Sequence, residues 1–317
     1  MARITLRLGR IMCEPLSFMS NISKTFGIFL IAFCVLVQQS ALSHESEPEK
    51  PKVKSSPKGH LIIHGGGRLT KDVVTRFAKL GIDEDGGHLV IVPTSGDGEI
   101  STDPKTASGW LKSLGFKKIT IMHTRSREVA DSDEFIEPLE DATAIWFSGG
   151  RQWRTMDVYD GTKSADAFRA VFARGGVIAG SSAGATVQGS YLVRGAKEGN
   201  QVMMAPGHEI GFGFLENVAI DQHAIKRGRL DDMIPVVTRF PNLLGIAIDE
   251  GTALEVHSGI AKVIGESKVA FYDHKKWADD GEKYELLAPG ERYDLSKRTK
   301  VEPPQTRLDQ RAVKNLE

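Results

Sequence analysis

The repeated order of short apolar runs, glycine-rich loops and helical patterns is the feature that most constrains this chain. Apolar runs of strand length occur at 61–64, 88–92, 119–122, 144–147 and 177–179. Segments with helical spacing lie between or after them, at 70–80, 103–114 and 165–173. Strands that alternate with helices form parallel sheets with helices on both faces. Ligands bind beyond the carboxyl ends of such strands, so we expect the functional residues there.

After Ser190 the alternation becomes less regular. Strands are predicted at 218–220 and 244–248, with a helix near 229–237 between them. Tight glycine turns separate three later apolar runs, which predicts an antiparallel β meander over 254–257, 261–264 and 269–272. The expected fold class is α/β, with a largely parallel sheet flanked by helices and this C-terminal meander.

The composition excludes two classes of protein. The 317 residues are 40% apolar and carry 41 basic and 41 acidic side chains. This apolar content is too high, and the net charge too low, for a disordered chain. A balanced charge also gives no electrostatic footprint for nucleic acid, so no nucleic-acid partner is expected.

The N-terminal segment has the pattern of a signal peptide. Its apolar run over 26–37 is shorter than the roughly 20 residues that a membrane-spanning helix needs. Basic residues precede the run, and small residues at 41 and 43 follow it, as at a cleavage site. We therefore expect residues 1–43 to direct export to the periplasm or the outside of the cell. The alternatives are an uncleaved membrane anchor and a translation start at Met19.

Cleavage after residue 43 would remove both cysteines, Cys13 and Cys34. The mature chain would then have no thiol nucleophile and no cysteine–zinc site. Residues 44–58 are polar and proline-rich, and we expect a flexible linker there. A single α/β domain is predicted over 59–293, followed by a charged, loosely ordered tail over 294–317.

A serine motif follows the apolar run at 177–179. Gly180, Ser182 and Gly184 fit G-x-S-x-G between a strand and a helix-forming run, which is the context of a nucleophile elbow. Small neighbours let strand and helix pass closely, so that the serine projects above the sheet. The N–H of Ala183 could then face a developing oxyanion. Ser181 is the adjacent candidate, and the alternative reading is a glycine-rich loop with an ordinary N-cap serine.

A serine nucleophile needs a histidine base and an orienting carboxylate. His223 follows the predicted strand at 218–220 and would project from the same sheet edge as Ser182. Other histidines that end strands are His64 and His123. The candidate carboxylates are Glu250 with its neighbour Asp249, Glu198 and Asp221. Spacing alone does not choose among them.

Four motifs in one order resemble the cyanophycinase and aspartyl dipeptidase (peptidase E) family of serine peptidases. They are FSGGRQWR (147–154), GSSAGA (180–185), DQHAIKRGRLDDMI (221–234) and GIAIDEGTALEV (245–256), and they cover roughly 60–275. The resemblance implies a fold related to class I glutamine amidotransferases, which is flavodoxin-like. It also implies a serine peptidase that cleaves next to aspartate, in cyanophycin the β-linked Asp–Arg unit.

The resemblance also implies roles for single residues. Ser182 would be the nucleophile, His223 the base and Glu250 the third member of the triad. Gly150 and Ala183 would supply the oxyanion N–H groups. The implied substrate-pocket residues are Gln152, Asp221, Gln222, Arg227 and Arg229, although Gln152 could instead satisfy loop backbone. No metal or cofactor is implied.

One position departs from the family pattern. Asp232, next to Asp231, stands near the place where cyanophycinases tend to carry a further arginine. Two acids there would favour a basic side chain in the substrate, or would simply cap a helix.

Three other functions are weighed against this one. An α/β-hydrolase esterase would use the His-Gly-Gly-Gly run at 64–67 as its oxyanion loop and a late histidine such as His274. A glutamine amidotransferase would need cysteine where Ser182 stands, and the third alternative is a non-catalytic binding protein. The expected partner is an aspartyl peptide, with membrane contact only through the leader. The sequence leaves open whether the chain forms a homodimer.

Overall fold

The computed structural model describes residues 58–277 and 281–302, all within one compact unit. The expected leader over 1–43 and all but Lys58 of the expected linker lie outside the described residues. The signal peptide and the alternative start at Met19 therefore stay predictions. Within the described ranges, no helix is both long enough and apolar enough to cross a membrane.

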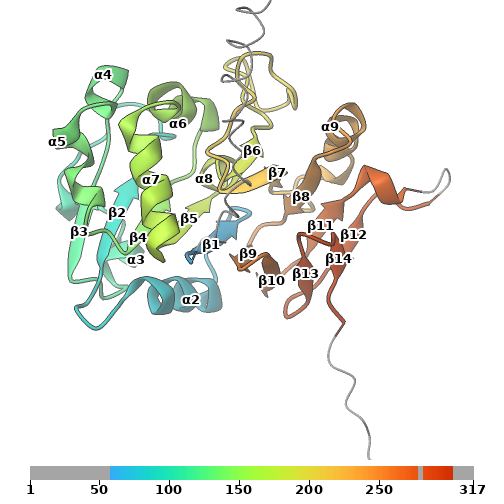
Figure 1. The fold of residues 1–317 in the computed structure, drawn as a ribbon, viewed down its shortest axis with the longest axis horizontal. Helices are drawn as coiled ribbons and strands as arrows, with labels where there is room; N and C mark the ends of the chain where they lie inside the picture. Colours follow the sequence, from blue (N-terminus) through green and yellow to red (C-terminus); the bar gives the residue numbers. More distant parts are fainter. Residues whose placement is uncertain (1–57, 278–280, 303–317) are drawn as a thin grey trace, which may run out of the picture. The chain divides into compact units, whose positions relative to one another are not determined.

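The predicted parallel sheet is confirmed as the core of a nine-stranded sheet (Figure 1). Its strand order is β14-β13-β10-β9-β1-β5-β4-β2-β3, and the five strands from β1 to β3 in that order run parallel. The parallel strands are β1 (His60–His64), β2 (His88–Val92), β3 (Lys118–Ile121), β4 (Ala144–Phe147) and β5 (Val177–Ser181). The antiparallel extension is β9 (Thr252–His257), β10 (Ile260–Gly265), β13 (Arg292–Asp294) and β14 (Thr299–Lys300).

A second sheet of five strands has the order β12-β11-β8-β7-β6. Its members are β6 (Gly189–Tyr191), β7 (Leu215–Gln222), β8 (Leu244–Ile248), β11 (Val269–Tyr272) and β12 (Glu285–Leu287). The chain crosses from this sheet back to the first between β8 and β9. Strands β6, β7 and β8 are parallel, so the carboxyl ends of β7 and β8 lie at one edge.

The predicted three-stranded meander over 254–272 is wrong in its last strand. β9 and β10 form a hairpin in the first sheet, but β11 pairs with β8 in the second. Phe271 of β11 lies opposite Ile246, and both are buried in the core that the two sheets share. β11 pairs with β8 because its apolar side chains are buried there. An apolar run in the sequence does not reveal which strand it will pair with.

The helices are short. Those of the first half are α2 (Lys71–Gly81), α3 (Gly109–Lys112), α4 (Arg127–Ala130), α5 (Asp133–Ile136), α6 (Gln152–Tyr159) and α7 (Lys163–Arg174). The later ones are α8 (Ala183–Thr186) and α9 (Met233–Arg239). The single helix predicted over 103–114 is wrong. A 3₁₀ turn at Pro104–Thr106 and the four-residue α3 replace it, because Ala107 and Ser108 are extended (ψ 143° at both).

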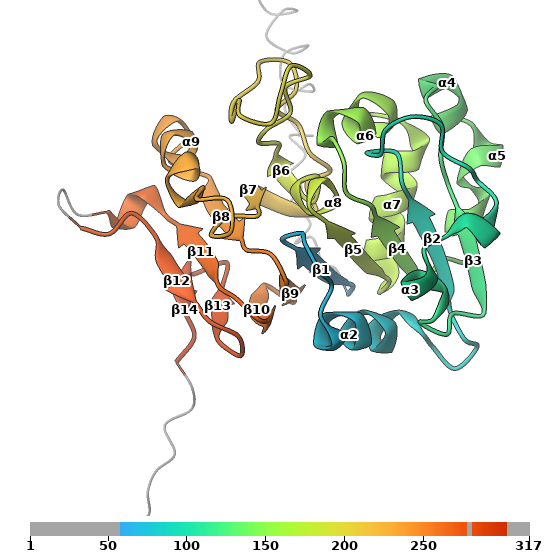
Figure 2. The same cartoon turned by 180° about the vertical axis from the view of Figure 1, so that it is seen from behind.

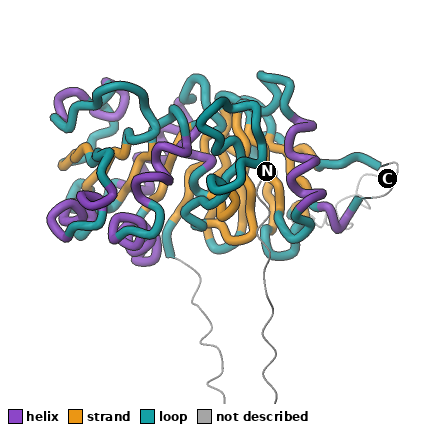
Figure 3. The backbone as a smooth tube through the Cα atoms, turned by 90° about the horizontal axis from the view of Figure 1, so that it is seen from above, coloured by secondary structure: helices purple, strands orange, loops and turns teal. Residues whose placement is uncertain are grey.

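Three apolar clusters define the layers. One face of the first sheet packs on α2 through residues such as Ile62, Phe77 and Trp146. The opposite face joins α7 and the inner face of the second sheet in the main core. Helix α9 covers the outer face of the second sheet, with Val236 and Val237 against Ala247. Figures 2 and 3 show the strands gathered between helices on either side.

The expected loose tail beginning at 294 is wrong for residues 294–302. Tyr293 of β13 is buried and its ring stacks on Phe271, with centroids 4.0 Å apart. β14 then pairs with β13, so the chain still adds to the first sheet here. Residues 303–317 lie outside the described residues.

Candidate active site

Three predicted residues meet where the two sheets approach each other. Ser182 follows β5, His223 follows β7 and Glu250 follows β8. Ser182 Oγ lies 3.0 Å from Nε2 of His223, and His223 Nδ1 lies 2.5 Å from Oε1 of Glu250. The hydroxyl can donate to Nε2 while Nδ1–H donates to the carboxylate. This is the hydrogen-bonding order in which an imidazole acts as a base toward a serine.

The backbone of Ser182 is strained, with φ 56° and ψ −113°. Two glycines make this sharp turn possible. A Cβ on Gly180 would lie 2.2 Å from the carbonyl oxygen of Gly184, and a Cβ on Gly184 would lie 2.0 Å from that of Phe147. Both positions therefore exclude any larger residue. The Ser182 side chain makes no capping hydrogen bond to α8, so the alternative reading as an ordinary N-cap serine is wrong.

Two backbone N–H groups flank Ser182. Ala183 is the first residue of α8 and directly follows the serine. Gly150 is close because its neighbour Gly149 packs on the serine: a Cβ built on Gly149 would lie 3.5 Å from Ser182 Cβ. Gly150 has φ 138° and packs directly on the carbonyl of Ser95. Within the described ranges, neither the Gly150 nor the Ala183 N–H donates a hydrogen bond. Both donors are therefore free for an acceptor beside the serine.

The electrostatics favour a neutral imidazole at the centre. Burial lowers the pKa of His223 below its ordinary value of 6.5, although the hydrogen bond to Glu250 acts in the opposite direction. The nearby guanidinium of Arg227 lowers the pKa of His223 further. A histidine that is neutral at pH 7 can accept a proton, as a general base must.

Of the alternative carboxylates, only Glu250 contacts His223. Glu198 is exposed in a loop. Asp249 accepts the N–H groups of Ile225 and Lys226 at 3.1 and 2.7 Å, so it shapes the turn that follows His223. Asp221 is fully buried and engaged elsewhere.

Asp221 pairs with an arginine that no motif in the sequence indicates. Both carboxylate oxygens of Asp221 bind the guanidinium of Arg194, at 2.7 and 2.8 Å, and Arg194 is also fully buried. Both oxygens of Asp221 are thus engaged with Arg194, and its predicted contact with substrate stays a prediction. A lone arginine in a loop carries no sequence signal, and its φ of 58° shows only in the structure.

Asp232 belongs to the same cluster. Its Oδ2 accepts a hydrogen bond from Arg194 Nη2 at 2.6 Å, and it makes no capping hydrogen bond to α9. The expectation that this acid caps the helix is wrong. Asp232 is thus a second carboxylate partner of Arg194, which also binds Asp221.

Two buried polar groups beside His223 have no partner among the described residues. Arg229 is 6% exposed, and its Nη1 is buried without a hydrogen bond. Burial lowers the pKa of Arg229, and the neighbouring Arg194 lowers it further. Gln222 is 4% exposed, and its Oε1 is also unpaired. Unpaired buried groups of this kind are costly in free energy unless a ligand completes them.

Unlike Arg229 and Gln222, the predicted pocket residues Arg227 and Gln152 have no unpaired buried side-chain atom among the described residues. Arg227 is more exposed, and its Nε lies 3.8 Å from Oε1 of Glu250. Gln152 is buried, and its Nε2 donates to the carbonyl of Val193 at 2.8 Å. Gln152 therefore braces the loop that carries Arg194, as the alternative reading of this residue expected.

The esterase arrangement is not what the structure shows. A Cβ on Gly66 would lie 2.2 Å from Cε1 of His223, and a Cβ on Gly67 would lie 2.7 Å from Oε2 of Glu250. The loop therefore packs against the base and the acid, and the Gly66 N–H donates to His64 at 3.3 Å. The ring of His274 packs on Trp277 and not on the serine.

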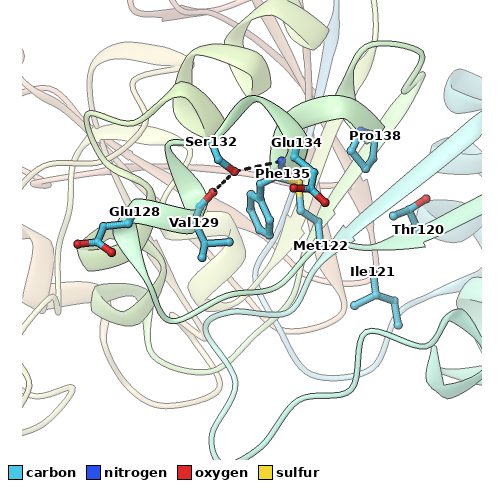
Figure 4. A pocket seen from close by; sticks show the side chains of 9 residues that line it. All are labelled: Thr120, Ile121, Met122, Glu128, Val129, Ser132, Glu134, Phe135 and Pro138. Carbon is cyan, nitrogen blue, oxygen red and sulfur yellow. Dashed lines mark hydrogen bonds between the residues drawn. The ribbon is translucent and has the colours of Figure 1, made fainter.

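An apolar hollow of about 540 Å³ lies elsewhere, beside β3, α4 and α5 (Figure 4). Its only serine, Ser132, accepts the N–H of Phe135 and donates to the carbonyl of Val129. That hydroxyl is a helix cap without a histidine partner, so we do not place the chemistry there. No group of three or more His, Cys, Asp or Glu side chains in the described ranges could hold a metal ion.

Comparison with known proteins identifies the family of this chain. Residues 61–264 match peptidase family S51. A cyanophycinase of Trichormus variabilis is 28% identical over 251 residues, which cover 71% of this chain and 80% of that protein. A cyanophycinase of Geminocystis herdmanii is 28% identical over 214 residues, covering 67% and 76%. The crystal structure of a peptidase from an acI-B1 Actinobacterium shares the fold, with TM-score 0.54, 24% identity, and coverage of 75% and 98%.

The family match and these relatives define a serine-type peptidase of the cyanophycinase type. Because the family match spans more than half of the residues, the chain belongs to peptidase family S51. The resemblance drawn from the four sequence motifs is therefore confirmed.

Proposed function

We propose that this chain is an exported serine peptidase that hydrolyses aspartyl or β-aspartyl peptide bonds, with Ser182, His223 and Glu250 as its triad. The observation that carries the proposal is the continuous hydrogen-bonded chain from Ser182 Oγ through both nitrogens of His223 to Glu250. These residues are far apart in the sequence, and each follows a different strand. The strained turn at Ser182 is then a nucleophile elbow.

The first half of the reaction forms an acyl-enzyme. His223 Nε2 takes the proton from Ser182 as the oxygen attacks the scissile carbonyl carbon. The resulting oxyanion accepts hydrogen bonds from the free N–H groups of Gly150 and Ala183. Glu250 keeps Nδ1 protonated and balances the charge of the imidazolium. His223 then protonates the leaving amine, and the carbon–nitrogen bond breaks.

The second half releases the acyl group. Water enters the place of the amine, and His223 takes one of its protons as the oxygen attacks the ester carbon. The same two N–H groups hold the second oxyanion. Collapse of this intermediate returns the proton to Ser182 and frees a carboxylic acid.

The unpaired groups beside His223 support an aspartyl substrate. A substrate carboxylate would accept a hydrogen bond from the unpaired Nη1 of Arg229. A planar guanidinium suits this role because it can bind a carboxylate through two parallel hydrogen bonds. A substrate N–H would donate to the unpaired Oε1 of Gln222. Arg227, more exposed beside Glu250, could meet a second carboxylate.

Mass spectrometry of digests tests the reaction and the substrate together. Wild type and Ser182→Ala are incubated with cyanophycin and with a set of α- and β-linked aspartyl dipeptides. Release of Asp-containing products by wild type, absent with Ser182→Ala, is expected. Ser132→Ala serves as the control, because Ser132 caps α5 and hydrogen-bonds only to backbone groups of neighbouring turns. Equal turnover by Ser182→Ala would refute the assignment, and cleavage of peptides without aspartate would refute the substrate.

Export is a separate part of the proposal, and it is supported by the leader pattern alone. The full chain is expressed with its natural N-terminus in a Gram-negative host, and the protein in the periplasm is analysed by intact mass. We expect a chain that begins at His44. A full-length mass confined to the cytoplasm would contradict export.

A further inference from the structure

Three successive carbonyls at the end of β1 hold the three parts of the proposed triad. The carbonyl of His64 accepts the Ser182 N–H at 3.0 Å, and that of Gly65 accepts the His223 N–H at 2.8 Å. The carbonyl of Gly66 accepts the N–H of Gly251, the residue after Glu250, at 3.0 Å. One short segment, residues 64–67, therefore sets the spacing of segments that come from both sheets.

The same segment also touches the catalytic side chains. The Cα of Gly66 faces the imidazole of His223, and that of Gly67 faces the carboxylate of Glu250, so closely that neither position has room for a Cβ. A shift of residues 64–67 would move the base and the acid together. The position of this segment therefore matters for the geometry of the whole site.

The His64 side chain is placed to hold this segment. The side chain is fully buried, and its Nδ1 lies 2.8 Å from Ser181 Oγ. The Gly66 N–H donates to the same Nδ1, with 3.3 Å between the two nitrogens. Nδ1 is therefore an acceptor and the ring proton sits on Nε2. Burial lowers the pKa of His64 to about 4, which keeps the imidazole neutral and Nδ1 free to accept.

We propose that His64 is a positioning residue, which locks residues 64–67 through Ser181 and Gly66 and so holds Ser182, His223 and Glu250 in register. The inference rests on the proposed function, because it concerns the same triad. His64 is not itself a catalytic residue. Its ring is closed off from solvent and contacts Ser181, the neighbour of the nucleophile.

Two substitutions separate the acceptor from the bulk of the ring. His64→Asn keeps an acceptor, because Oδ1 can take the place of Nδ1, whereas His64→Leu fills the space without one. His88 offers a matched control at the opposite end of the sheet. It is also buried, and its ring nitrogens bind Asp141 and Thr120. His88→Leu and His88→Asn should lower thermal stability without affecting the chemistry.

The measurement is the second-order rate constant for labelling of Ser182 by a fluorophosphonate probe, which depends on the triad and not on the substrate. Hydrolysis of a β-Asp–Arg dipeptide is measured in parallel, with the downfield proton resonance of His223 Nδ1–H as a check of geometry. We expect His64→Leu to lower the labelling rate and kcat about 100-fold, as misplacement by about 1 Å does. KM should stay close to the wild-type value.

The outcomes are distinct. His64→Asn should recover most of the labelling rate. Ser181→Ala should add little loss to His64→Leu, because the leucine has already removed the hydrogen bond between His64 and Ser181. Equal losses in the Leu and Asn variants, or an equal loss in His88→Leu, would overturn the proposal. A wild type that reacts with the probe but cleaves no aspartyl peptide contradicts the proposed substrate alone. A wild type that is not labelled at Ser182 overturns both proposals.

Discussion

Glu250 and Ser182 bind opposite nitrogens of one imidazole, because Oε1 of Glu250 lies 2.5 Å from Nδ1 of His223 and Ser182 Oγ lies 3.0 Å from Nε2. The tautomer that lets Nε2 accept a proton needs Nδ1 to be a donor, and Glu250 provides the acceptor. The crossing from β8 to β9 brings the carboxylate to this place, since Glu250 lies between β8 of the second sheet and β9 of the first.

Replacement of that carboxylate tests its role in the tautomer. We expect Glu250→Gln to lower kcat by about 10³–10⁴-fold, because the amide can donate to Nδ1 and favour the wrong tautomer. KM should change little. The measurement is steady-state hydrolysis of a β-Asp–Arg dipeptide. Glu266→Gln is the matched control, since Glu266 pairs with Arg68 at the surface. A loss below about tenfold would argue against Glu250 as the third member.

The dependence of kcat/KM on pH should report His223 in the free enzyme. Burial lowers the pKa of His223 below 6.5, so the neutral base persists to lower pH than for a solvated histidine. The acid limb should therefore have its midpoint below pH 6.5. Glu250→Gln removes the interaction that raises this pKa, so the midpoint should move lower still. A midpoint above 6.5 would contradict the burial of a neutral imidazole.

Arg229 should be important for activity and unfavourable for stability. We expect Arg229→Met to lower kcat/KM for aspartyl peptides about 10²-fold, because a charge-assisted hydrogen bond contributes about 1.5–3 kcal/mol. The same variant should unfold at higher urea concentration, because it removes a buried guanidinium nitrogen that has no partner. Arg227→Met, at the more exposed position, should change stability little. An Arg229→Met enzyme with undiminished kcat/KM would contradict the substrate assignment.

The buried pair of Arg194 and Asp221 should contribute to folding. Arg194→Met leaves the fully buried carboxylate of Asp221 without its partner, which costs about 3–5 kcal/mol when one member of a buried pair is removed. Urea denaturation at pH 7 measures the free energy of unfolding. Arg194→Met combined with Asp221→Leu should recover much of the loss, since no buried charge remains at either position. A loss below about 1 kcal/mol in the single variant would show that Asp221 is solvated.

Local sequence signals predicted the parts of the site that depend on local geometry. Gly180 and Gly184 leave no room for a Cβ beside Ser182, so the six residues 180–185 are enough to predict the turn. His223 and Glu250 were candidates because each follows an apolar run. Spacing did not choose Glu250 over Glu198 or Asp221, because that choice depends on how the two sheets meet.

The remaining features depend on long-range packing. Arg194 and Asp232 are 38 positions apart, and nothing near either residue indicates that they pair. β11 was expected beside β10 but lies against β8, where Phe271 completes the core. The glycines at 66 and 67 suggested an oxyanion loop, whereas they give His223 and Glu250 room to approach the backbone. Each of these outcomes depends on contacts between segments that are far apart in the sequence.

Mapping the site of covalent modification tests the central claim most directly. The mature protein is treated with a fluorophosphonate probe, digested and sequenced by mass spectrometry, with peptidase activity followed over the same time course. We predict one adduct per chain on Ser182, activity lost in proportion to labelling, and no adduct in His223→Ala. His274→Ala should label at the wild-type rate. An adduct on Ser181 or on another residue, or full activity after Ser182 is modified, would contradict the account.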